Sequence, residues 1–115
     1  MELNKTADEM SDIIARMLRN KFGNKIDDVQ IFNIVEIPYK TFSVKFSAYN
    51  YFVVLFNYDR GIIGCNIQYG EKSFIVLENS QKWYEKADFD VFYKELQEQL
   101  ELRIPDKYLE ANGWK

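Results

Sequence analysis

Apolar residues near the start of the chain recur at the spacing of one helix face. They stand three and four positions apart, at Met10, Ile13, Ile14, Met17 and Leu18. This pattern predicts an amphipathic helix from about Thr6 to Lys21, with one buried stripe. Thr6 and Glu9 form a T-x-x-E capping box, which satisfies two free backbone donors at a helix start. Gly23 follows where a helix commonly ends.

Beyond Gly23 the period of the pattern changes from 3.6 to 2, which is typical of strands. The clearest alternation is at Phe42, Val44, Phe46 and Ala48, with polar residues between them. Before it, an alternating face is expected at Val29, Ile31, Val35 and Ile37, with Asn33 as a polar exception and Pro38 as the end. Residues 51–58 are apolar on both faces, as expected of a central strand or an interface.

Two further strands are predicted after this central strand. Ile63, Cys65, Ile67 and Tyr69 share one face of a fourth strand, and residues 74–77 form a short fifth. Turns are expected at Tyr49-Asn50, at Asp59-Arg60-Gly61 and at Gly70-Glu71-Lys72. Five phenylalanines are expected in the core: Phe42, Phe46, Phe52, Phe56 and Phe74.

Helical spacing returns after Ser80. The second stripe consists of Phe89, Phe92, Tyr93, Leu96 and Leu100, with Asp88 as the expected N-cap. Pro105 is expected to begin a last short helix that Gly113 ends. The candidate anchors of this helix are Tyr108, Leu109 and Trp114.

This order of elements predicts the fold class. Short turns cannot join parallel neighbours, so the four or five strands should form an antiparallel meander. Amphipathic helices on both sides of the strands need a surface to cover, and one sheet face provides it. We therefore expect an α+β two-layer sandwich, with an N-terminal helix, an antiparallel four- or five-stranded meander sheet and C-terminal helices. Residues 1–115 should form a single domain.

The composition of the chain excludes several kinds of catalytic and binding site. The 115 residues include 15 Lys and Arg, 18 Asp and Glu, no His and one Cys, with a formal net charge of −3. The lack of His and of a second Cys excludes His-based triads, His metal sites and an internal disulfide. An acidic chain repels phosphate backbones, which makes nucleic acid a poor partner. The glycines match neither the dinucleotide fingerprint nor the phosphate-binding loop. We expect no cofactor and no metal.

The remaining polar candidates for catalysis have simpler interpretations. Cys65 is in phase with the apolar positions of its strand, which indicates a buried structural thiol. The carboxylate pairs Asp27-Asp28 and Asp88-x-Asp90 stand at element starts, where Asp caps helices and turns. We therefore predict no catalytic residues and no enzyme activity. A lone cysteine, no secretory leader and no apolar run of about 20 residues predict a cytoplasmic protein without membrane association.

Tyrosine content and charge suggest a contact surface instead. Eight tyrosines cannot all be interior, and Tyr and Trp are enriched at protein interfaces. Residues 78–110 contain nine acidic against five basic side chains. This segment is either an ordinary solvated helix face or an acidic patch for a basic partner. The expected contact residues are Trp83, Tyr84, Asp90, Glu98 and Glu101. Trp83 is either a hydrophobic anchor or a staple between helix and sheet. The exposed side of the sheet and the turn at 58–61 are the next candidates.

The closing stretch, residues 104–115, reads IPDKYLEANGWK. It resembles the tails of the small immunity proteins of bacterial polymorphic toxin systems, notably those of contact-dependent growth inhibition. The short, acidic, tyrosine-rich α+β chain is similar to these proteins as well. The resemblance implies a cytoplasmic antitoxin that binds the C-terminal domain of a cognate toxin, in many cases a nuclease. It would neutralise that domain by covering the active site or substrate-binding surface.

A second resemblance is to the dimeric chaperones of type III secretion, which are also small acidic α+β proteins. The implied function is to hold an unfolded client segment. The consecutive strands of this chain depart from that pattern, and its oligomeric state stays open.

Overall fold

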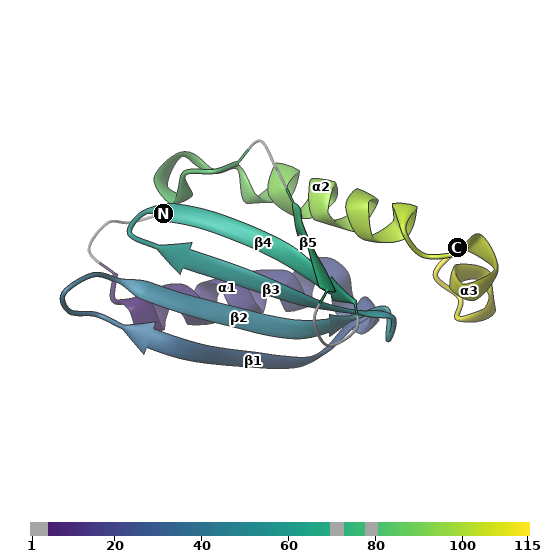
Figure 1. Ribbon diagram of the computed structural model, residues 1–115, viewed down its shortest axis with the longest axis horizontal. Coiled ribbons are helices and arrows are strands. Elements are labelled where there is room, and N and C mark those ends of the chain that lie inside the picture. Colours follow the sequence, from purple (N-terminus) through teal and green to yellow (C-terminus); the bar gives the residue numbers. More distant parts are fainter. Residues whose placement is uncertain (1–4, 70–72, 78–80) are drawn as a thin grey trace.

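The computed structural model describes residues 5–69, 73–77 and 81–115. The predicted turn at 70–72 and the predicted core position of Phe74 lie outside what it describes. The longer elements, drawn in Figure 1, are α1 (Ala7–Phe22), β1 (Ile26–Val35), β2 (Thr41–Ala48), β3 (Phe52–Asp59), β4 (Ile62–Tyr69), β5 (Ser73–Leu77), α2 (Phe89–Leu102) and α3 (Asp106–Ala111). Two single 3₁₀ turns, η1 (Gly23–Lys25) and η2 (Tyr84–Lys86), join α1 to β1 and precede α2.

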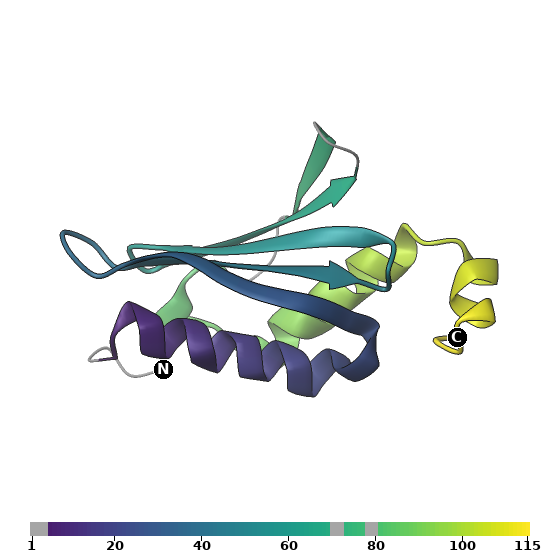
Figure 2. The same cartoon turned by 90° about the horizontal axis from the view of Figure 1, so that it is seen from below.

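The five strands form one antiparallel sheet in the order β1-β2-β3-β4-β5. Both long helices lie on the same face of this sheet, as Figure 2 shows, and no helix of the described residues lies over the opposite face. The α+β two-layer sandwich with a meander sheet is therefore confirmed, with five strands. The short helix α3 lies beyond the C-terminal end of α2 (Figure 1).

Side-chain caps begin the two long helices at the predicted positions. The Thr6 hydroxyl accepts a bond of 3.1 Å from the Glu9 backbone N–H, and the Glu9 carboxylate accepts one of 3.0 Å from the Thr6 N–H. The Asp88 carboxylate accepts bonds from the backbone N–H groups of Asp90 and Val91, at 3.1 and 3.3 Å. Each cap satisfies donors that the first helical turn leaves without a partner.

The two hairpin turns of the central strands lie at the predicted places: residues 49–51 join β2 to β3, and residues 60–61 join β3 to β4. Tyr49 and Asn50 have φ angles of 57° and 50°, and Arg60 and Gly61 have 51° and 93°. Positive φ at both central residues is the geometry that matches the right-handed twist of the flanking strands. These turns hold β2, β3 and β4 in direct succession.

The expected alternation in β1 is wrong at its second half. Its pairing with β2 shifts register between Asp27 and Gln30 and again between Phe32 and Val35. Asp28 and Asn33 have positive φ angles of 53° and 54°. Such bulges insert an extra residue and reverse the facing of those that follow. Val35, which was expected on the buried face, is exposed as a result, and Ile37, expected on the same face, lies beyond the end of β1 and is exposed as well.

Aromatic contacts join the sheet to α2 and α2 to α1. The rings of Phe56 on β3 and Phe92 on α2 meet edge to face at 5.7 Å, and Phe22 on α1 meets Tyr93 on α2 at 6.4 Å. Such pairs add about 0.5–1.5 kcal/mol each to the burial of the rings. Four of the eight tyrosines are buried: Tyr49, Tyr58, Tyr84 and Tyr93. Half of the tyrosines therefore belong to the core, although composition alone could assign them to a contact surface.

Candidate protein-binding surface

Trp83 and Ile62 lie side by side at one end of the sheet, where they form an isolated antiparallel bridge. Two backbone hydrogen bonds flank this pair: Ile63 N–H to Lys82 O at 2.9 Å and Tyr84 N–H to Gly61 O at 3.0 Å. Paired residues of adjacent strands point to the same face. Tyr84, the next residue, points into the core, so Trp83 points to the sheet face opposite α1 and α2.

Arg60 extends this surface from the turn between β3 and β4 to the loop between β1 and β2. Its backbone N–H donates to Lys40 O at 3.1 Å, and its guanidinium carbon lies 4.9 Å from the centre of the Tyr39 ring. Its Nε also donates to the Asp59 carboxylate at 3.0 Å. The side chain is therefore held over Tyr39 by an ion pair and a cation–π contact.

We call this end of the molecule the hairpin-tip patch. Its members are Ile37, Tyr39, Arg60, Ile62 and Trp83. Ile37 is 84% exposed, Tyr39 56%, Trp83 51% and Ile62 38%. A cavity of about 330 Å³ lies within it, lined in part by Trp83, Arg60 and Lys86. Exposed Trp, Tyr and Arg in one place have the composition of the residues that contribute most to binding energy in protein interfaces.

The predicted acidic face of α2 is present only in part. Asp90 and Glu98 are exposed, with Lys94 exposed between them in sequence. Glu101 is partly buried, and its Oε2 accepts bonds from the Tyr49 hydroxyl at 2.6 Å and from Gln97 Nε2 at 2.9 Å. Burial opposes ionisation of this carboxyl, but the bonds from Tyr49 and Gln97, together with the charges of Lys25 and Lys115, outweigh it, so the pKa of Glu101 is lowered. Glu101 therefore stabilises the fold through these two bonds and contributes less to the exposed acidic face of α2.

The structure also corrects the expected exposure of Tyr84. Only 2% of this residue is exposed, and its ring packs edge to face against Tyr58 at 5.2 Å and Phe89 at 5.6 Å. Its side chain is not available to a partner. The backbone of its neighbour Trp83 joins the segment before α2 to β4, while the indole stays half exposed, and a role as an anchor for a partner stays a prediction.

Sequence reasoning placed Ile37 on the buried face of a strand, did not single out Tyr39 and Ile62, and reached Arg60 only through the turn at 58–61. A local signal was available for two of them. Ile37 and Tyr39 flank Pro38, the predicted end of the strand. The packing of two hairpin tips brings Tyr39 next to Arg60, and the isolated bridge brings Ile62 next to Trp83, and no local pattern contains either contact.

The residues considered for chemistry have structural roles. Cys65 is buried, as predicted, and burial raises the pKa of its thiol to about 12. Asp88 is an N-cap, and the Asp27 carboxylate accepts a bond of 2.8 Å from the Asp28 backbone N–H. Within the described residues, no group of three or more His, Cys, Asp and Glu side chains is placed to hold a metal ion. No helix in the same part of the chain is long and apolar enough to cross a bilayer.

Comparison with known proteins adds no relative to this picture. No protein-family model matches the chain, and no curated protein or solved structure matches it with significance.

Proposed function

We propose that this protein acts by binding another protein, and that the partner is a bacterial toxin domain whose active site or substrate-binding surface it covers. The observation that carries the proposal is the exposure of the Trp83 side chain on a backbone that is held in place. An indole that is half exposed, and whose backbone is bridged to Ile62, is a preorganised anchor. A rigid anchor loses less conformational entropy on binding than a flexible one.

The composition of the hairpin-tip patch supports the same proposal. Tyr39 and Arg60 are already stacked, so both enter a complex with part of their freedom removed. Exposed carboxylates at Asp88 and Asp90 follow Trp83 closely in the chain. They would favour a partner with basic groups around an apolar centre, such as the cleft of a nuclease.

The resemblance of residues 104–115 to immunity-protein tails narrows the partner class to toxin domains. In the fold this segment lies at α3. The Tyr108 hydroxyl donates to Tyr49 O at 2.7 Å, and Trp114 Nε1 donates to Asn24 Oδ1 at 3.3 Å. The segment therefore anchors α3 to the body of the domain, and the contact with a toxin is assigned to the hairpin-tip patch.

The test is co-expression with the toxin domain encoded by a gene adjacent to the protein's own gene. We expect the wild-type chain to restore growth and to be recovered with that domain in a pull-down. Trp83→Ala should weaken the complex by about 10- to 100-fold, as for a residue central to an interface. The matched control is Leu102→Ala, which removes a side chain that is 76% exposed at the far end of α2.

Two results would contradict the proposal at different levels. If no adjacent toxin domain exists and the chain protects no cell, the immunity function is wrong. If the chain protects cells but Trp83→Ala and Leu102→Ala behave alike, the function stands and the assigned surface is wrong. A stable dimer that retains an unfolded client segment would indicate a secretion chaperone instead.

A further inference from the structure

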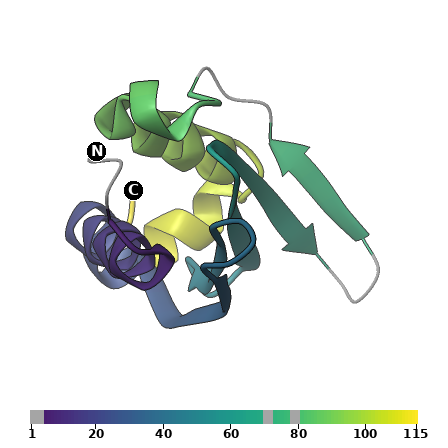
Figure 3. The ribbon, with the colours of Figure 1, turned by 90° about the vertical axis from the view of Figure 1, so that its left-hand side faces the viewer.

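A second concave site lies at the opposite end of the sheet from Trp83. Figures 2 and 3 show β5 and the end of β4 leaning away from the layer of helices. Between these strands, the start of β3 and the end of α2 there is a cavity of about 560 Å³. This volume is within the range of small-molecule sites, roughly 300–1,000 Å³.

The walls of this cavity continue the apolar face of the core. Phe52, Tyr69 and Ile75 line it, and they stand two positions from the buried Val54, Ile67 and Leu77. Alternate residues of a strand share a face, so these three side chains are on the helix-facing side of the sheet. Tyr69 is nonetheless 48% exposed. The cavity is therefore a part of the core surface that α2 does not cover.

One cation stands among the described residues that line the cavity: Arg103, the C-cap of α2. Its Nη1 donates to the backbone oxygen of Gln99 at 2.9 Å and to Gln99 Oε1 at 2.7 Å. These two bonds hold the guanidinium in place. They leave the Nε–H and Nη2–H groups, which point to the same side of the guanidinium and match the two oxygens of a carboxylate.

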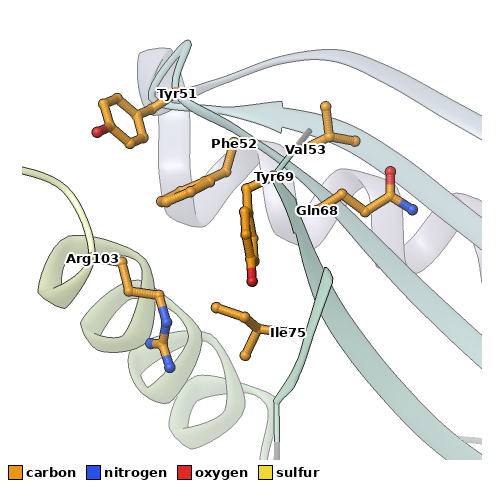
Figure 4. Close-up of a pocket in the computed structure, with 7 residues that line it drawn as sticks. All are labelled: Tyr51, Phe52, Val53, Gln68, Tyr69, Ile75 and Arg103. Carbon is orange, nitrogen blue, oxygen red and sulfur yellow. The ribbon is translucent and has the colours of Figure 1, made fainter. Parts of the chain in front are cut away.

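The geometry of the site brings this cation and the aromatic walls together. In Figure 4, Tyr69 extends from β4 into the space between sheet and helix, with Phe52 beside it. Its hydroxyl points toward the region between Ile75 and the Arg103 guanidinium. An apolar group placed against Phe52 and Tyr69 would thus have a hydroxyl and a charged donor at one end.

We propose that this cavity binds a small organic acid, an aromatic or aliphatic group that carries one carboxylate. The apolar part would cover Phe52, Tyr69 and Ile75, and the carboxylate would accept from Arg103 and the Tyr69 hydroxyl. A single negative charge matches the single described cation. The C-terminal end of α2 adds partial negative charge nearby, which disfavours a ligand with several negative charges. This site is separate from the hairpin-tip patch and does not depend on a toxin partner.

The test uses 2-naphthoate as the acid and 2-naphthamide as its neutral counterpart, titrated into the full chain and followed by amide NMR. We expect saturable shifts at residues 52–53, 68–69 and 75, with the acid bound about tenfold more tightly than the amide. Arg103→Gln should remove that tenfold preference. Arg19→Gln, which removes an exposed cation from α1, should leave it unchanged.

Two further variants keep the result clear if Arg103→Gln does not fold. Arg103→Lys keeps the charge but loses the paired donors, and it should reduce the preference for the acid to about threefold. Tyr69→Ala should weaken both probes, because it removes a wall of the cavity, and should weaken the acid more, because it also removes the hydroxyl that donates to the carboxylate. Equal affinity of the two probes for the wild type, an unchanged preference in Arg103→Gln, or shifts confined to other residues would each overturn the proposal.

Discussion

The hydroxyl of Tyr49 donates a hydrogen bond of 2.6 Å to the carboxylate of Glu101. Tyr49 is a fully buried residue of the turn between β2 and β3, and Glu101 is in the last turn of α2, 52 positions later. The backbone oxygen of Tyr49 also accepts from the Tyr108 hydroxyl. One turn residue thus ties the sheet to both C-terminal helices.

Removing this hydroxyl should destabilise the domain. We expect Tyr49→Phe to lower the free energy of unfolding by about 1–3 kcal/mol, because a hydrogen bond to a charged group is lost and no new one replaces it. Urea unfolding followed by circular dichroism measures the change. Tyr39→Phe is the matched control, since that ring is 56% exposed. Equal midpoints for both variants would show that the Tyr49 bond contributes little.

The same pair predicts a dependence of stability on pH. The pKa of Glu101 is lowered in the folded state from an ordinary value of 4.5. Its ionised form therefore stabilises the fold above about pH 4.5, and this contribution is lost as the pH falls through the lowered pKa. The stability difference between wild type and Glu101→Gln should be largest near pH 7 and shrink below pH 4.5. A difference that stays constant from pH 7 to pH 3 would contradict this assignment.

Asp88 should act as a helix cap and in no catalytic role. Asp88→Ala is expected to cost about 1 kcal/mol of stability, because the N–H groups of Asp90 and Val91 lose their acceptor. Asp88→Asn keeps an acceptor oxygen and should retain most of that stability. Thermal unfolding of the two variants beside the wild type measures the difference. If Asn and Ala are equally destabilising, the carboxylate has a role other than capping.

The thiol of Cys65 should be unreactive in the native protein. Burial raises its pKa to about 12, so almost no thiolate is present at neutral pH, and the side chain is 4% exposed. We expect a chromogenic disulfide reagent to label Cys65 within minutes in guanidinium chloride and at least 100-fold more slowly without it. Rapid labelling of the native chain would indicate that β4 opens readily.

The exposed carboxylates of α2 should affect the rate of partner binding rather than stability. In the complex with the proposed toxin domain, Asp90→Lys with Glu98→Lys is expected to slow association several-fold at low salt, with the difference fading above about 0.3 M salt. The control double variant, Asp12→Lys with Glu110→Lys, makes the same charge change at exposed positions elsewhere. Equal slowing by both would indicate net charge alone, with no defined acidic face.

Local patterns in the sequence were sufficient for most of the fold. The stripes of α1 and α2 recur at 3.6 residues, and a capping side chain stands at the start of each. Hydrogen bonds between near neighbours and one-sided burial depend only on residues a few positions apart. The same is true of the turn at Tyr49 and Asn50, where a three-residue loop, residues 49–51, follows a regular strand.

Local patterns were not sufficient for the candidate site. Trp83 was predicted as a contact residue and is exposed, while the adjacent Tyr84 is buried. The two differ because an isolated bridge to Ile62 sets which of them faces the core. That bridge joins positions 21 residues apart, and no periodic pattern covers residues 81–88. Glu101 likewise has the spacing of a residue on the outer face of α2. It is partly buried because the turn at Tyr49 packs against it.

By itself, the sequence determined the elements, their order and the single face of the sheet that the two long helices cover. Periodicity, caps and short turns are local, and their energies act within each segment. Only the tertiary structure decided that Arg60 would lie over Tyr39, and that β5 would lean away from α2 to leave Arg103 beside an open apolar cavity. Those relations depend on strand register, on sheet twist and on where each helix ends, which are properties of the assembled domain.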